Sequence, residues 1–292
     1  MINSSNKKII NIKLKNKIIS INPFTCIVHE ICALIKRLYL QTFRRPSTLI
    51  SGIIQPLLWL ILFGALFQNA PVGLFTSNIK YNRFLSPGII IFTSFTGSIN
   101  AGLPIMFDRE FGFLNRLLIS PLKSRNSLLI STVFFIITVT MLQTIFIIFF
   151  NICVYQRLEY QPHIIITILS ITLLITLSTA SISICLAFIL PGHIELLAFI
   201  LIINLPMLFS STALAPLSFM PYWLQIIASI NPLTYAIELI RYLFNSTTIS
   251  NNRFIMENIW VNLNFYDCIF LLIFINLISI IIIKSVISYK FE

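Results

Sequence analysis

Long, continuously apolar stretches separated by short polar segments dominate the chain. A helix needs about 20 residues, at about 1.5 Å of rise each, to cross a hydrocarbon layer of about 30 Å. The stretches that reach or approach this length are residues 49–68, 85–106, 128–150, 164–190, 194–211 and 266–283. Their apolar residues are continuous and do not alternate with polar ones, which indicates helices and argues against a barrel. We therefore predict an all-α, polytopic membrane protein with six transmembrane helices.

Two further segments carry helical patterns of a different kind. Between residues 24 and 45, apolar residues recur every three or four positions and the opposite face is basic. This predicts an N-terminal amphipathic helix in the membrane interface, with an ordinary cytoplasmic helix as the alternative. Residues 212–265 are interrupted by prolines and polar runs, so we expect short outer-face helices before the last span. Residues 1–22 are expected to be a mobile tail, which leaves residues 23–292 as one transmembrane domain.

Composition and charge support a membrane protein. Of the 292 residues, 57% are hydrophobic and 10% are charged, and the mean hydropathy is +0.93. These values exclude both a soluble globular domain and a disordered chain. The net charge of +11 would suggest nucleic acid on a soluble protein, but 15 of the 20 Lys and Arg residues lie in residues 1–48, in residues 107–127 or after residue 283. Since basic residues concentrate on the untranslocated side, we expect both termini on the cytoplasmic or stromal side, a lipid bilayer as partner, and no nucleic acid.

No motif for catalysis, a cofactor or a metal is recognisable. The five cysteines form no CxxC pair, and no HExxH sequence or paired carboxylates occur. These features also argue against an intramembrane enzyme. A phosphate-binding GxxxxGK[ST] loop is absent, so any ATP would have to be hydrolysed by another subunit. The Ser and Thr residues between 167 and 183 could line a path, but hydrogen bonding between helices is the favoured interpretation.

Two polar segments hold the residues that narrow the choice of function. The first joins the second and third apolar stretches, from Phe107 to Leu122, and is short, charged and amphipathic. Its Gly112 indicates either a kink or a close approach of two backbones. By its residues alone this segment is a charged cytoplasmic connection of the kind found in any membrane protein. The second runs from Pro221 to Arg241, and its Asn-Pro pair at 231–232 predicts a helix start with Asn as N-cap.

Together these segments resemble the signatures of the ABC type-2 (ABC-2) transporter permeases. The first matches the family's acidic residue, glycine, Leu-rich turn and proline. The matching residues are Glu110, Gly112, Leu114, Arg116, Leu117, Leu118 and Pro121. The second resembles the family's outer-face segment, through Pro221, Asn231, Pro232, Tyr235 and Arg241. Phe111 and Phe113 depart from the family pattern, which often has a small residue or Thr beside the glycine. The resemblance covers the chain from about residue 24.

The resemblance implies a function that the residues alone do not. In this family the first segment is the coupling helix, which docks on an ATPase subunit. Arg109, Glu110, Gly112, Leu114, Arg116, Leu118 and Pro121 are therefore candidates for coupling. The family implies a permease subunit of an ABC exporter, acting as a homodimer or heterodimer with an ATP-binding subunit in trans. An ion-coupled secondary transporter or channel is the alternative, and would need charges at mid-membrane.

The composition also bears on the origin of the gene. Isoleucine and asparagine, whose codons are AT-rich, are abundant in the chain. An organelle genome or a low-GC bacterium would fit this bias. Because the chain also resembles the plastid-encoded members of the family in red algae, we favour a plastid membrane over a bacterial inner membrane.

Overall fold

The computed structural model describes residues 23–67, 81–119, 126–155, 162–245, 256–257 and 262–291. The tail predicted over residues 1–22 lies outside this part of the chain. The elements are α1 (Pro23–Arg44), α2 (Pro46–Leu66), α3 (Tyr81–Asn100), α4 (Leu103–Glu110), α5 (Phe113–Ile119), α6 (Asn126–Tyr155), α7 (Pro162–Ile189), α8 (His193–Phe209), the 3-10 turn η2 (Leu217–Phe219), α9 (Tyr222–Ile230), α10 (Pro232–Asn245), β1 (Met256–Glu257), β2 (Asn262–Leu263) and α11 (Phe265–Phe291).

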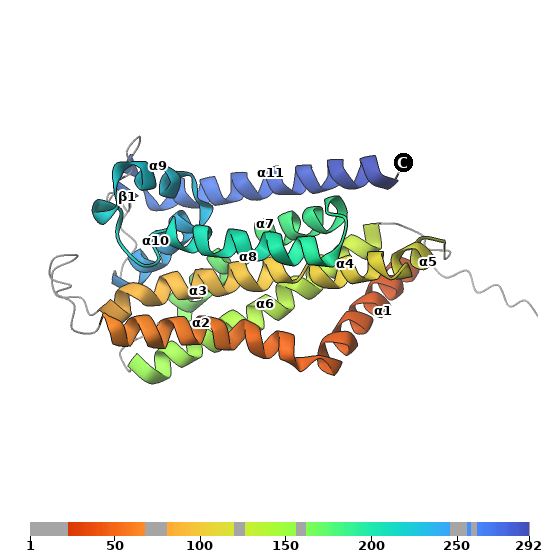
Figure 1. Cartoon of the computed structure of the whole chain (residues 1–292), viewed down its shortest axis with the longest axis horizontal. Coiled ribbons are helices and arrows are strands. Elements are labelled where there is room, and N and C mark those ends of the chain that lie inside the picture. Colours follow the sequence, from red (N-terminus) through yellow and green to blue (C-terminus); the bar gives the residue numbers. More distant parts are fainter. Residues whose placement is uncertain are drawn as a thin grey trace, which may run out of the picture.

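The long helices α2, α3, α6, α7, α8 and α11 run side by side along one axis (Figure 1). At one end of this bundle lie α1, α4, α5 and the C-terminal end of α11, and at the other lie α9, α10 and β1 (Figure 1). We call these the inner and the outer end. Successive long helices run in opposite directions, so the segments that the basic residues assign to the cytoplasmic side gather at the inner end.

Within the described part of the chain, five helical segments are long and apolar enough to cross a membrane. They are Leu49–Leu66, Arg83–Glu110, Ser127–Val154, His163–Ile189 and Phe265–Val286. The fifth predicted span corresponds to α8, which has 17 residues and lies at the short limit of about 17 residues for a crossing helix. The expected all-α, polytopic membrane fold is confirmed.

Two features differ in detail from the sequence expectation. The second span extends beyond residue 106, because α4 continues α3 after a short turn and ends only at Glu110. A minimal antiparallel pair, β1 and β2, joins Met256 to Leu263 within the segment expected to hold only short helices. The prolines and polar runs of that segment carry no alternating pattern, so nothing in the sequence indicated the pair.

The helix α3 forms the centre of the bundle. Within its span 72% of the residues are buried, against 17% in the spans of α2 and α11. Hydrogen bonds join α3 to α7: Ser98 bonds with Thr179, and the Ser183 hydroxyl donates to the Ile99 carbonyl at 2.5 Å. Most other hydroxyls of the 167–183 stretch donate to carbonyls of their own helix three or four residues earlier. The predicted hydrogen bonding between helices is therefore seen at Thr179 and Ser183, while most of the other hydroxyls of the stretch bond within α7.

Candidate functional site

The end of the second span and the polar connection after it form a sharp bend, Leu103–Ile119, which we call the elbow. At the bend Gly112 has a φ of 71°, and its N–H donates to the Arg109 carbonyl at 3.2 Å. Among the residues that the structure describes, none places an atom within 4 Å of where a Cβ on Gly112 would lie. Glycine therefore serves the left-handed backbone that lets α5 fold away from α4. Of the two interpretations left open by the sequence, the kink is confirmed and the close backbone approach is wrong.

The elbow is tied to the amphipathic helix α1 through Asp108. This carboxylate forms an ion pair with Arg37 of α1. The same guanidinium lies 4.2 Å from the ring centroid of Phe113, the first residue of α5. Arg37 thus contacts both helices of the elbow. This pair could not be predicted from the sequence, because Asp108 and Arg37 are 71 positions apart and any basic residue could have been the partner.

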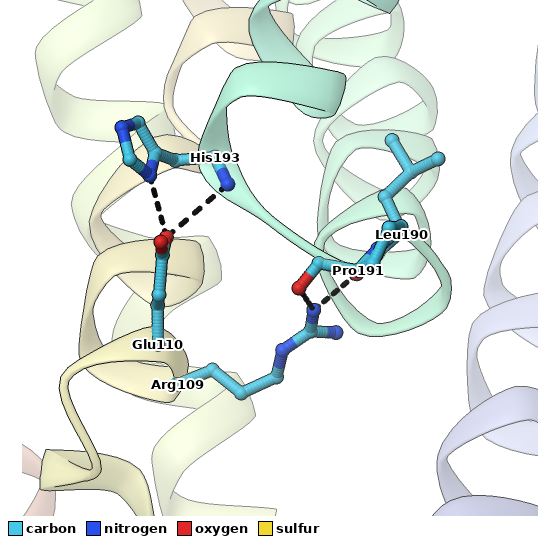
Figure 2. Close-up of polar contacts among 5 residues, drawn as sticks. All are labelled: Arg109, Glu110, Leu190, Pro191 and His193. Atoms are coloured by element: carbon cyan, nitrogen blue, oxygen red, sulfur yellow. Dashed lines mark hydrogen bonds and ion pairs between the residues drawn. The ribbon is translucent and has the colours of Figure 1, made fainter.

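Arg109 closes the C-terminal end of α7. Its Nη1 donates to the carbonyls of Ala187 and Phe188, at 2.8 and 2.9 Å. Its Nη2 donates to the carbonyls of Leu190 and, at 2.8 Å, Pro191 (Figure 2). Carbonyls in the last turn of a helix lack partners within that helix, and a cation there also complements the helix dipole. Arg109, a candidate for coupling, is therefore engaged within its own chain.

Glu110 contacts the N-terminal end of α8. Its Oε2 accepts hydrogen bonds from the backbone N–H of His193, at 3.2 Å, and from His193 Nδ1, at 2.6 Å (Figure 2). Since an ionised carboxylate can only accept, the proton of this second bond is on Nδ1. Arg109 and Glu110 are thus adjacent in sequence and opposite in charge. The cation binds the C-terminal end of α7, and the anion binds the N-terminal end of α8, which follows after a tight turn.

The remaining elbow residues divide into buried and exposed ones. Leu114 is buried, with 7% of its surface exposed, and anchors α5 to the bundle. Arg116 is exposed, as are Phe111 at 74% and Ile119 at 85%. The side chain of Leu118 and all of Pro121 lie outside the part of the chain that the structure describes. The elbow therefore has one side fastened to neighbouring helices and one side facing outward.

The second polar segment forms a corner at the outer end, Tyr222–Asn245, where α9 and α10 meet at 86°. The predicted helix start is confirmed: Asn231 Oδ1 accepts the Leu233 N–H at 3.0 Å, and Pro232 is the first residue of α10. The Asn231 Nδ2 also donates to the Met207 carbonyl at 3.0 Å and to the Ser210 hydroxyl at 3.1 Å, both at the end of α8. Pro221 directly precedes α9.

Arg241 and Tyr235 hold this corner together from within. Arg241 pairs with Glu238, lies 3.8 Å from the ring centroid of Phe84 in α3, and donates to the Thr212 carbonyl at 2.8 Å. The side chains of Arg241 and Glu238 are only 12% and 15% exposed. The Tyr235 hydroxyl donates to a carbonyl at the end of α9. Arg241, Glu238 and Tyr235 thus make their polar contacts within the chain, and the Arg241 and Glu238 side chains are largely covered.

Comparison with known proteins decides the family. A family model described as "ABC-2 type transporter" matches residues 29–245, which include both the elbow and the corner. The chain belongs to the ABC-2 type transporter family.

The curated relatives of this ABC-2 chain span nearly its whole length. It is 53% identical over 264 residues to "Putative transport permease ycf38" of Porphyra purpurea, covering 90% of each chain. A protein of the same name in Pyropia yezoensis is 52% identical over 264 residues, again covering 90% of each. That of Cyanophora paradoxa is 46% identical over 290 residues, which is 96% of this chain and 99% of the relative. With its apolar helices, the ABC-2 chain is a multi-pass membrane protein of the permease type.

Proposed function

We propose that the chain is the membrane-spanning permease subunit of an ABC exporter in a plastid membrane. Separate nucleotide-binding subunits hydrolyse the ATP, and two copies of the permease, or one copy and a homologue, form the pathway. Both termini and the elbow face the stroma. The membership of the ABC-2 family and the similarity to algal transport permeases support this assignment.

The elbow is the observation on which the proposal depends. A subunit that moves on binding ATP can act on the membrane domain only through a rigid contact with it. The elbow offers such a contact, because Asp108, Arg109 and Glu110 fasten it to α1, α7 and α8. Its opposite side presents Phe111 and Arg116 to a partner. Aromatic and Arg side chains are the residues most enriched in protein interfaces.

The distribution of charge favours this function over an ion-coupled secondary transporter. A proton or ion relay needs ionisable groups near mid-membrane. Among the described residues, the Arg37–Asp108 ion pair and the Glu110–His193 hydrogen bonds lie at the inner end, and the Glu238–Arg241 ion pair lies in the outer corner. The interior of the bundle between them is lined by apolar, hydroxyl and amide side chains.

The test is affinity purification of the full chain from its membranes in mild detergent, followed by identification of the bound subunits. We expect a protein with ATP-binding motifs to co-purify. Phe111→Ser should lower the amount captured, because Phe111 is 74% exposed at the elbow. Tyr222→Ser is the matched control, since Tyr222 is an aromatic residue 66% exposed at the opposite end.

Equal capture by the two variants would contradict the elbow as the docking site. Purification of the native chain without any ATP-binding subunit, together with transport that is insensitive to ATP, would favour the ion-coupled alternative.

A further inference from the structure

The helix α8 packs against the rest of the bundle over a narrow face. Only Leu196, Ile200 and Leu208 are buried along its length. Ile203 and Met207 are partly buried against the same core. The side chains that face outward are Ile194, Leu197, Leu201, Ile202, Leu205 and Phe209. Lateral contacts between apolar side chains stabilise a helix weakly in lipid, because lipid tails are equally apolar. The position of α8 should therefore depend strongly on the polar contacts at its two ends.

Each end of α8 is held by one of the two sequence segments described above. At the inner end, Glu110 of the elbow bonds to His193, the first residue of α8. At the outer end, Asn231 of the corner bonds to the Met207 carbonyl and to the Ser210 hydroxyl. Figure 1 shows α8 running from the inner to the outer end between these two attachments.

The helix α3 connects the same two regions in parallel. At the inner end α3 continues into α4 and hence into the elbow. At the outer end the Arg241 guanidinium lies over the ring of Phe84 and donates to the Phe84 carbonyl at 3.4 Å. Because α3 is the most buried span and α8 is packed on a narrow face, a displaced elbow would move the two helices unequally. The corner, attached to both, would respond to the difference.

We propose that α8 is a connecting strut, through which movement of the elbow reaches the outer corner by way of the Glu110–His193 and Asn231–Met207 contacts. The inference deepens the proposed function, on which its role in transport rests. In structural terms the two ends of α8 are coupled, so that breaking the attachment at one end also makes the other end of the helix more mobile. This holds in the resting protein, so no ATP-binding subunit is needed to examine it.

The experiment places single spin labels on the full chain in lipid nanodiscs and records their mobility by electron paramagnetic resonance. The labels replace Ile194 near the inner end of α8 and Leu205 near its outer end, both of which face outward. Cys26, Cys32 and Cys153 are first replaced by Ser, since they are not buried. A label at Leu142, which is 62% exposed on α6, serves as reference.

Two substitutions cut the two attachments one at a time. Glu110→Ala removes the hydrogen bonds to His193. Asn231→Ser shortens the side chain so that it no longer bonds to the Met207 carbonyl, while Ser remains a good N-cap for α10. We expect each substitution to shift both α8 labels toward the mobile spectrum and to leave the Leu142 label unchanged. Arg37→Gln is the matched control: it releases the elbow from α1 but not from α8, and should leave the Leu205 label unchanged.

The proposal is overturned if each substitution loosens only the nearer label, or if the Leu142 label changes equally. Should Glu110→Ala fail to fold, the effect of Asn231→Ser on the Ile194 label decides the question alone. Capture of an ATP-binding subunit, measured on the same variants, separates the two proposals. If the two α8 labels respond together but the native chain captures no ATP-binding subunit, only the proposed function is contradicted. If the native chain captures that subunit but the labels respond separately, only the connecting role of α8 is contradicted.

Discussion

The elbow and the corner both hold neighbouring helices through hydrogen bonds to backbone carbonyls, yet they differ in what they leave exposed. At the elbow, Glu110 keeps 35% of its side chain exposed and Phe111 keeps 74%. At the corner, Asn231 is 5% exposed and the Arg241 side chain 12%. The elbow thus exposes residues right beside its attachments, while at the corner the polar residues are covered and the exposed ones, such as Tyr222 and Trp223, are aromatic side chains of α9.

This difference bears on how the two family segments should be interpreted. Both segments contain charged residues. At the corner these residues pair with each other, so substituting them should affect the stability of the fold. Charge at the elbow is divided between internal attachment and the exposed surface, so substitutions there should separate stability from partner binding. The following changes are ordered from the largest expected effect on stability to the smallest.

Arg241→Met should be the most damaging change. It leaves the mostly buried carboxylate of Glu238 without its cation, which we expect to cost about 3 kcal/mol of unfolding free energy. Unfolding by sodium dodecyl sulfate in mixed micelles measures the loss. Adding Glu238→Leu should restore much of it, because the unpaired charge is then gone. If Arg241→Met alone were as stable as the native chain, Arg241 and Glu238 would not form a mostly buried ion pair.

Gly88→Ala should have the next largest effect on stability. The cause is steric crowding, which does not arise at Gly112 of the elbow. A Cβ on Gly88 of α3 would lie 2.7 Å from the Cα of Ala213, a backbone atom in the segment between α8 and the corner. Forcing an extra methyl into a packed site costs about 1–3 kcal/mol. The same unfolding assay applies, and an unchanged midpoint would mean that α3 and this segment are not in close contact.

Gly112→Ala should cost less, about 1 kcal/mol, because only the backbone conformation is affected and the added Cβ meets nothing. Gly112→Asn should recover part of this cost, since Asn tolerates the left-handed region better than other residues. The comparison of the two variants by unfolding isolates the backbone effect. If Ala and Asn were equally destabilising, the bend at Gly112 would need another explanation.

Arg116→Glu should change stability by no more than about 0.5 kcal/mol, as an exposed side chain away from the elbow's attachments. Its expected effect is on capture of the ATP-binding subunit, which should fall because the charge presented to the partner is reversed. Unchanged capture by a stable variant would place the docking surface elsewhere on the inner end.

The sequence predicted the secondary structure around both segments well. Gly112 marks the bend and Asn231 caps α10, because both roles depend on local backbone geometry that a residue type can indicate. The partners of Asp108, Arg109 and Glu110 could not be predicted. They lie 71 to 83 positions away, and they depend on which helices are neighbours.

By itself, the sequence determined that the chain crosses a membrane and where its helices lie, since each span must satisfy its backbone internally and be apolar over a sufficient length. The order of the helices within the bundle was decided only by the tertiary structure. The span of α3 is the least apolar of the five and the most buried, at 72%, while that of α11 is the most apolar and only 17% buried. In a bilayer, hydrophobicity drives a helix into the membrane but not toward other helices, so close packing and hydrogen bonds select its neighbours.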